Sequence, residues 1–310
     1  MTPEQITYLV FGCVLVLALT IDLGLLSKKS TIISTKKAMW QTIFWVLLAM
    51  AFGVFVWLED GKQIALEYIS AYLMEWSLSI DNIFVFILIF TFFGIKEANY
   101  GRVLLIGILM AIVLRILFIT VGIELVERFK FILYIFGAIL IYTGFKMFTA
   151  KHEEDANLDD NAVYKFLKKH FPITTTDHGS KIIAIENGKK VYTKIFVVII
   201  MLATTDIIFA IDSIPAVFAI SQNPLVIYTS NIFAVLGLRS LFFLLKGAVN
   251  KFSHLQQGIA IILVFIGVKM LIEIFHIKVP VYISLVVIVT CIVASILYSI
   301  QVSQKNDESQ

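Results

Sequence analysis

Nine stretches of apolar residues constrain this chain more than any other feature. Each has about 18 residues or more, which as a helix is enough to cross a bilayer core of roughly 30 Å. None shows the alternation of polar and apolar residues that is typical of membrane β-barrels. Lipid offers no partners to backbone polar groups, so helices are the remaining solution. The sequence therefore predicts an all-α polytopic membrane helical bundle of about nine spans, one transmembrane domain over residues 1–310. The stretches are Ile6–Leu26, Met39–Leu58, Ile64–Phe93, Val103–Leu125, Phe129–Phe148, Ile195–Ile220, Leu225–Leu245, Leu255–Phe275 and Val279–Ile300.

Composition supports the same class. Hydrophobic residues make up 59% of the chain and charged residues 15%, with a mean hydropathy of +0.93. A soluble globular protein is nearer half apolar and about a quarter charged. Glu4 precedes the first stretch without any Lys or Arg. We therefore expect a membrane span there and not a cleavable signal peptide.

The distribution of positive residues predicts the orientation. With the N-terminus outside, 18 of the 25 Lys and Arg residues fall in cytoplasmic loops or the C-terminal tail, and 5 fall outside. Positive residues collect on the cytoplasmic side of membrane proteins. We expect a multi-pass protein of a bacterial inner (plasma) membrane, with the N-terminus outside and the C-terminus in the cytoplasm. This asymmetry explains the net charge of +3 without a nucleic-acid partner.

One long polar segment, residues 150–193, interrupts the apolar stretches. It is expected to form a cytoplasmic loop. It opens with an acidic patch over Glu153–Asp160 and later contains Asn187-Gly188 between two short runs of strand-forming residues. Asn-Gly is a strong signal for a type I′ turn, so a short β-hairpin is predicted there.

An internal repeat relates two groups of three spans, over residues 64–148 and 195–275. In each copy the first span carries an acid, five residues, an Asp and a small polar residue. The second span carries an Arg, and the third ends in Gly-Xaa-Lys-Met. Three spans are an odd number, so the second copy must be inverted in the membrane. Inverted repeats with polar helices in matching positions are typical of transporters with a site near the midplane. The matching residues are Glu75, Asp81, Asn82, Arg115 and Lys146 in the first copy, and Asp206, Asp212, Ser213, Arg239 and Lys269 in the second.

Six of these residues place charges inside the membrane. Each costs about 2.5–3.5 kcal/mol at the bilayer centre, so they are expected to face the bundle interior and one another. Four acids and two arginines sum to −2, which one divalent cation or two protons would balance. The predicted metal ligands are Glu75, Asp81, Asn82, Asp206, Asp212 and Ser213, with Arg115, Asn231 and Arg239 in support.

The donor atoms limit the choice of metal. The candidate ligands are all oxygen atoms, the histidines fall in loops or at span edges, and Cys13 and Cys291 lie in the terminal spans. Such a site favours hard cations such as Mn²⁺, Mg²⁺ or Ca²⁺. On an ideal helix Glu75 and Asp81 lie about 120° and about 9 Å apart. Either the helix unwinds between them, with Pro215 as the equivalent breaker in the second copy, or the acids are successive stations along a path.

The motifs also resemble a known family. Met74–Phe86 (MEWSLSIDNIFVF), Asp206–Ser221 and Tyr228–Leu245 are similar to signature segments of the TerC/Alx membrane proteins, and the resemblance extends from about Glu67 to Leu271. The family takes its name from tellurite resistance. The resemblance implies an organisation like that of LysE-type exporters and a role in manganese homeostasis by efflux.

These observations predict a membrane transporter that exports divalent metal cations, with Mn²⁺ as the expected substrate, through an acidic midplane site. Proton exchange is one way to drive it. The alternative is a membrane anchor or partner protein in metal or tellurite stress resistance, acting through its cytoplasmic loop. No enzyme motif is present, and no tightly bound cofactor is expected. The expected partners are the lipid bilayer and a divalent metal ion, with a homodimer or soluble stress-resistance proteins as further options.

Overall fold

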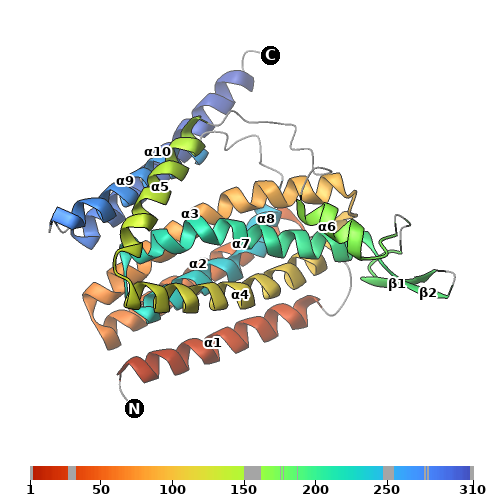
Figure 1. Cartoon of the computed structure of the whole chain (residues 1–310), viewed down its shortest axis with the longest axis horizontal. Coiled ribbons are helices and arrows are strands. Elements are labelled where there is room, and N and C mark those ends of the chain that lie inside the picture. The colour runs from red at the N-terminus through yellow and green to blue at the C-terminus, as the bar shows by residue number, and fades with distance from the viewer. Residues whose placement is uncertain are drawn as a thin grey trace.

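The computed structural model describes residues 3–26, 33–149, 162–174, 176, 178–186, 188–246, 255–275, 277 and 279–307. Most of this chain is helical, and the long helices lie side by side (Figure 1). The elements in chain order are α1 (Pro3–Leu26), α2 (Thr35–Asp60), α3 (Lys62–Phe92), α4 (Glu97–Arg128), α5 (Ile132–Thr149), α6 (Ala162–His170), β1 (Ile183–Glu186), β2 (Lys189–Tyr192), α7 (Lys194–Ile220), α8 (Pro224–Leu245), α9 (Leu255–Ile272), the 3₁₀ turn Glu273–Phe275 and α10 (Val281–Asp307).

The lengths and hydropathies of these helices fit a membrane protein. Within the described residues, seven helices are long and apolar enough to cross a bilayer, namely α2, α3, α4, α7, α8, α9 and α10. Shorter apolar segments lie in α1 (Gln5–Thr20) and α5 (Ile132–Phe148). The prediction of an all-α polytopic membrane bundle is confirmed, and the count of nine spans stays a prediction.

Local signals fix where α8 begins. The Asn223 side-chain oxygen accepts a hydrogen bond from the Leu225 amide at 2.9 Å, and Pro224 occupies the first turn. Asn at this capping position satisfies an amide that the helix itself leaves unpaired, and Pro is tolerated there because its missing N–H is not needed. The cap sets the depth of every polar side chain along α8.

Helix α8 forms the centre of the bundle and is almost entirely buried. It packs against α2 and α3, while α4 packs along α7. Helices α5, α9 and α10 lie together at one side of the molecule, inclined to the other long helices (Figure 1). In the predicted repeat, α3 is equivalent to α7, and α4 is equivalent to α8. Exchanging the two halves therefore turns the α3–α8 contact into the α7–α4 contact.

Glycines bring α5 and α9 into close contact. A Cβ on Gly144 would lie 2.8 Å from the Ala260 carbonyl oxygen, and a Cβ on Gly267 would lie 2.6 Å from the Gly137 carbonyl oxygen. Residue numbers fall along α5 as they rise along α9, so the two helices are antiparallel. Aligning Gly144 with Gly267, as the repeat does, also places Gly137 on Ala260. The same contact therefore occurs twice, as an inverted repeat would require; the inversion relative to a bilayer stays a prediction.

The polar segment contains more structure than the sequence indicated. Helix α6 was not predicted. Strands β1 and β2 pair antiparallel, from Ile183 opposite Tyr192 to Glu186 opposite Lys189. Gly188 has φ +77° in the turn, while Asn187 lies outside the described residues. The acidic patch Glu153–Asp160 also lies outside them.

Hydrogen bonds hold this segment against the bundle. The Thr193 hydroxyl donates to the Lys181 carbonyl at 2.6 Å, and the Asn99 side chain at the start of α4 donates to the Gly179 carbonyl at 3.4 Å. His178 lies 2.7 Å from Glu186, and this bond is the main cause that lowers the pKa of the Glu186 carboxyl. The hairpin is therefore docked near the α4 and α7 N-termini.

Replacing Gly267 with Ala is expected to loosen the α5–α9 contact. The new methyl group would lie too close to the Gly137 carbonyl, so the helices must separate, and overpacking of this kind costs about 1–3 kcal/mol. Thermal unfolding in detergent should show a lower melting temperature. Gly12→Ala in α1 is the matched control, because nothing lies within 4 Å of its Cβ position. Equal melting temperatures for both variants would contradict the close contact.

Candidate cation site in the centre of the bundle

Arg115, on α4, is the centre of a buried polar cluster. Its Nε donates to Asp206 Oδ2 at 2.8 Å and its Nη2 donates to Asp206 Oδ1 at 3.0 Å. This is the two-pronged geometry in which a guanidinium binds a carboxylate most strongly. Arg115 therefore links α4 directly to α7.

The remaining nitrogen of Arg115 reaches two more helices. Its Nη1 donates to Glu75 Oε1 on α3 in a short ion pair, and to Asn231 Oδ1 on α8 at 3.1 Å. The Asn231 amide is itself oriented by its donation to the Ile227 carbonyl at 3.0 Å. One side chain thus connects the four helices that form the middle of the bundle.

The cluster is dry. Glu75 and Asn231 are 0% exposed, and Arg115 and Asp206 are each 2% exposed. Charges taken out of water are tolerated only when they are paired and hydrogen-bonded. Two acids and one guanidinium leave a formal charge of −1 among these described side chains. The structure brings together four of the predicted site residues: Glu75, Asp206, Arg115 and Asn231. Their role in binding metal stays a prediction.

Several buried oxygen atoms near the repeat motifs have no hydrogen-bond partner among the described residues. They are Glu75 Oε2, Ser77 Oγ, Ser79 Oγ, Asn82 Oδ1 and Ser213 Oγ. Buried polar atoms are rarely left unpaired, and each such group calls for a water, an ion or a function. All five can act as ligands of a hard cation. By contrast, the Thr204 hydroxyl is bonded to the Ile200 carbonyl at 2.6 Å.

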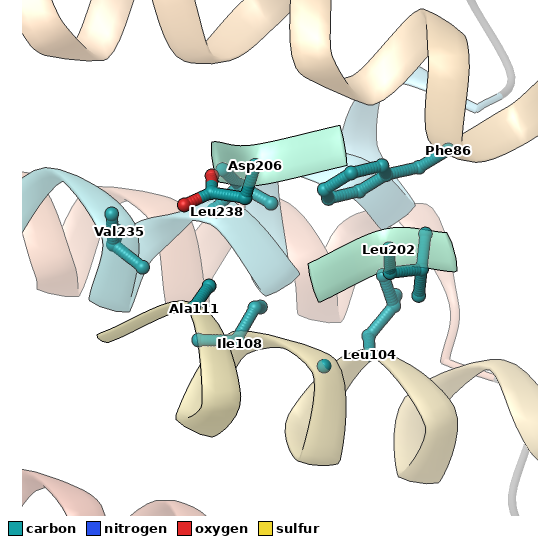
Figure 2. Close-up of a pocket in the computed structure, with 9 residues that line it drawn as sticks. Phe86, Leu104, Ile108, Ala111, Leu202, Asp206, Val235 and Leu238 are labelled. Carbon is teal, nitrogen blue, oxygen red and sulfur yellow. The ribbon is translucent and has the colours of Figure 1, made fainter. Parts of the chain in front are cut away.

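A small cavity adjoins Asp206. It is lined by α3, α4, α7 and α8, and Asp206 is the one charged residue among those that line it. Figure 2 shows its carboxylate directed toward Val235 and Ala111, while Phe86 and Leu202 lie on the other side. Apart from Asp206, no polar residue marks this cavity in the sequence. Gly107, which has no side chain to fill the space, also lines it.

The acidic residues of α3 and α7 lie at two depths in the bundle. Near one end of the bundle Glu67 on α3 accepts a hydrogen bond from Ser221 on α7 at 2.5 Å, while Glu75 and Asp206 meet at Arg115. Helices α3 and α7 are therefore antiparallel. Counted from the Glu67–Ser221 bond along these antiparallel helices, the Glu75 backbone lies at about the depth of Asp212, and the Asp81 backbone at about the depth of Asp206.

The backbones of Asp81 and Asp212 differ in depth by about 7 Å. Their side chains lie outside the described residues, so their contacts are not part of the site geometry. Among the described residues, no group of three or more His, Cys, Asp or Glu side chains could hold a metal. Successive stations along a path stay a prediction.

The expected helix breaks do not occur. Helix α3 is continuous from Lys62 to Phe92, and α7 is continuous from Lys194 to Ile220 despite Pro215. Of the two alternatives for these acids, the unwound helix is therefore contradicted. Membrane helices tolerate an internal Pro because surrounding helices and small adjustments satisfy the freed backbone groups. Arg239 is 4% exposed on α8, next to Leu238, which lines the cavity.

Replacing Asp206 with Asn is expected to destabilise the protein by about 3–5 kcal/mol, because it removes one partner of a buried ion pair. Chemical unfolding in detergent measures this change. Glu124→Gln is the control, since Glu124 pairs with Arg128 on the same helix as Arg115 but at an exposed position. Exposed pairs contribute about 0–1 kcal/mol. A loss for Asp206→Asn no larger than for Glu124→Gln would contradict the described ion pair.

Comparison with known proteins agrees with the motifs and the fold. Membrane protein STKORF319 of Myxococcus xanthus is 42% identical over 282 residues, which cover 91% of this chain and 88% of that protein. A membrane protein of Rickettsia felis is 39% identical over 294 residues, covering 95% and 97%. A protein of Escherichia coli K12 named "Putative membrane-bound redox modulator Alx" is 38% identical over 310 residues, covering 97% and 96%. No solved structure matches the chain. Residues 60–307 match the family described as "Integral membrane protein TerC family", so this chain belongs to the TerC family of integral membrane proteins.

Proposed function

We propose that this protein is a membrane transporter of divalent metal cations. The observation that carries the proposal is the dry cluster of Glu75, Arg115 and Asp206 at the centre of the bundle, beside buried oxygens that lack partners. Ionisable groups inside a membrane bundle are costly, and they usually mark an ion or proton pathway. A purely structural ion pair would not require the unpaired oxygens.

The ligand chemistry supports a hard cation. The available donors near the cluster are carboxylate, amide and hydroxyl oxygens, which suit Mn²⁺, Mg²⁺ or Ca²⁺. His170 and His178 lie in the polar segment and not in the bundle. Mn²⁺ is our proposed substrate because of the resemblance of the motifs to proteins of manganese homeostasis. Export is the proposed direction.

The arrangement of helices supports alternating exposure of the site. Equivalent acids, Glu75 and Asp206, meet at one arginine, and α3–α8 corresponds to α7–α4. In such a pair of inverted halves, rocking one half against the other opens the site first to one side and then to the other.

Transport by purified protein in liposomes tests the proposal. Wild type should take up Mn²⁺ when Mn²⁺, Ca²⁺, Zn²⁺ and tellurite are offered in separate assays. Ser213→Ala should lower this flux about tenfold or more, as loss of a metal-site group does, without loss of stability, because the Ser213 hydroxyl has no partner in the described structure. Glu75→Gln should lower the flux further.

Ser240→Ala is the matched control for this assay. Ser240 is buried, and its hydroxyl already donates to the Gly237 carbonyl at 2.9 Å, so it has no free role in an ion path. It should transport like wild type. If correctly inserted wild type carries no flux of any ion, the transporter proposal is wrong. If Ser213→Ala and Ser240→Ala show equal flux, the proposed site is wrong.

The second candidate function is a partner protein that acts through its polar loop. The observation in its favour is the hairpin, where Ile183 is 48% exposed and Ile185 is 72% exposed on the same strand. Apolar side chains on an exposed edge strand offer a binding surface for another protein. The name of the Escherichia coli relative speaks of redox modulation, whereas Cys13 and Cys291 of this chain are free thiols.

Replacing Ile183 and Ile185 together with Ser separates the two functions. Both side chains are exposed, so the fold should be unaffected. A transporter should keep its flux in liposomes and its effect on cellular metal resistance. A partner protein should lose resistance in cells. A dimer stays a prediction; cross-linking in native membranes measures it.

A further inference from the structure

The carboxylates at the centre of the bundle are already occupied by a cation, and that cation is part of the chain. Arg115 takes both oxygens of Asp206 and one oxygen of Glu75. The proposed substrate would have to use the same two acids. Metal ion and guanidinium therefore compete for one site.

We propose that Arg115 is a built-in counter-cation: it is displaced from Glu75 and Asp206 by the transported divalent cation and returns to them after the ion leaves. This inference rests on the proposed function and concerns how the metal-free protein returns to the conformation that binds the next ion. With Arg115 back in place, the site can change its exposure without a metal. Without Arg115, two buried carboxylates would have to make that change uncompensated.

The chemistry of arginine suits this role. A guanidinium stays protonated in proteins, so its charge cannot be lost when it leaves a carboxylate. Asn231 gives it a partner that is neutral, at 3.1 Å from Nη1. That bond does not have to break when Glu75 and Asp206 turn to a metal. Asn231 thus provides a place where the displaced group keeps a hydrogen bond.

The cavity beside Asp206 gives its side chain room to turn. The other residues that line it are apolar or glycine, so the cavity is space next to the carboxylate and not a path for the ion. Each carboxylate oxygen can accept more than one interaction. Asp206 can therefore contact the ion while still bonded to Arg115, and Glu75 follows. The exchange proceeds in steps, and no stage leaves both acids bare.

Gly107 reveals that the repeat does not copy this arrangement. The alignment of Arg115 with Arg239 places Asn231 opposite Gly107, eight residues before each arginine. A Cβ at Gly107 would lie 3.3 Å from Leu202, so there is little room for an amide there. The first copy therefore has no amide at the position equivalent to Asn231.

Net transport and exchange separate the counter-cation from a structural ion pair. Uptake of radioactive Mn²⁺ is measured into empty liposomes, which requires the metal-free protein to reset, and into liposomes preloaded with unlabelled Mn²⁺, which does not. For Arg115→Gln we expect the rate of net uptake to fall about tenfold or more. Exchange should stay within about twofold of wild type.

Two further variants complete the test. Arg115→Lys keeps a tethered cation and should retain most net uptake, although it loses the two-pronged bond. Arg128→Gln removes an exposed arginine from the same helix and should change neither assay. Acidic medium should partly restore net uptake by Arg115→Gln, because protons can neutralise the bare acids.

The inference is overturned if folded Arg115→Gln loses uptake and exchange equally, or keeps both. If Arg115→Gln does not fold, Arg115→Lys decides: folded Arg115→Lys with exchange but no net uptake would equally contradict a counter-cation role. Failure of the proposed function looks different, since wild type itself would then neither take up nor exchange Mn²⁺.

Discussion

The contacts of one guanidinium organise the middle of this protein. Arg115 bonds to α3 through Glu75, to α7 through Asp206 and to α8 through Asn231. Without this group, two carboxylates would be buried in a medium that cannot solvate them. Because both acids must reach the same arginine, the depths of α3 and α7 are fixed relative to α4. The positions of Asp81, Asp212 and the cavity follow from that registration.

The cluster is possible only because the surrounding helices exclude water and lipid. α8 is buried along nearly its whole length, and glycines let α5 and α9 approach until backbone and side chain touch. Such packing gives cohesion where the hydrophobic effect does not act between helices. The interior is therefore stiff around a polar centre. Movement of whole halves changes the exposure of that centre more easily than local unwinding, which fits the unbroken course of α7 through Pro215.

Much of this structure could be predicted from the sequence because lipid makes polar residues expensive. The apolar stretches gave the helices, and the cost of buried charge implied that Glu75, Asp206 and Arg115 meet. What could not be predicted depends on three-dimensional registration. The common depth of Glu75 and Asp212, and of Asp81 and Asp206, requires knowing that α3 and α7 are antiparallel and which residues lie opposite one another. The cavity depends on what Leu202 and Gly107 leave unfilled. Helix α6, with only nine residues, lacked a membrane-length signal.

The mutual contact of Gly137 with Gly267 and of Gly144 with Ala260 has a consequence for the origin of the fold. A contact that maps onto itself when the halves are exchanged can also form between two separate, identical three-helix chains inserted in opposite directions. If the two halves are inverted in the bilayer, as predicted, the protein is equivalent to a fused dual-topology dimer. Fusion frees each half to diverge, and the difference between Gly107 and Asn231 is such a divergence. A symmetric ancestor would have had to place either two amides or none around its central arginines.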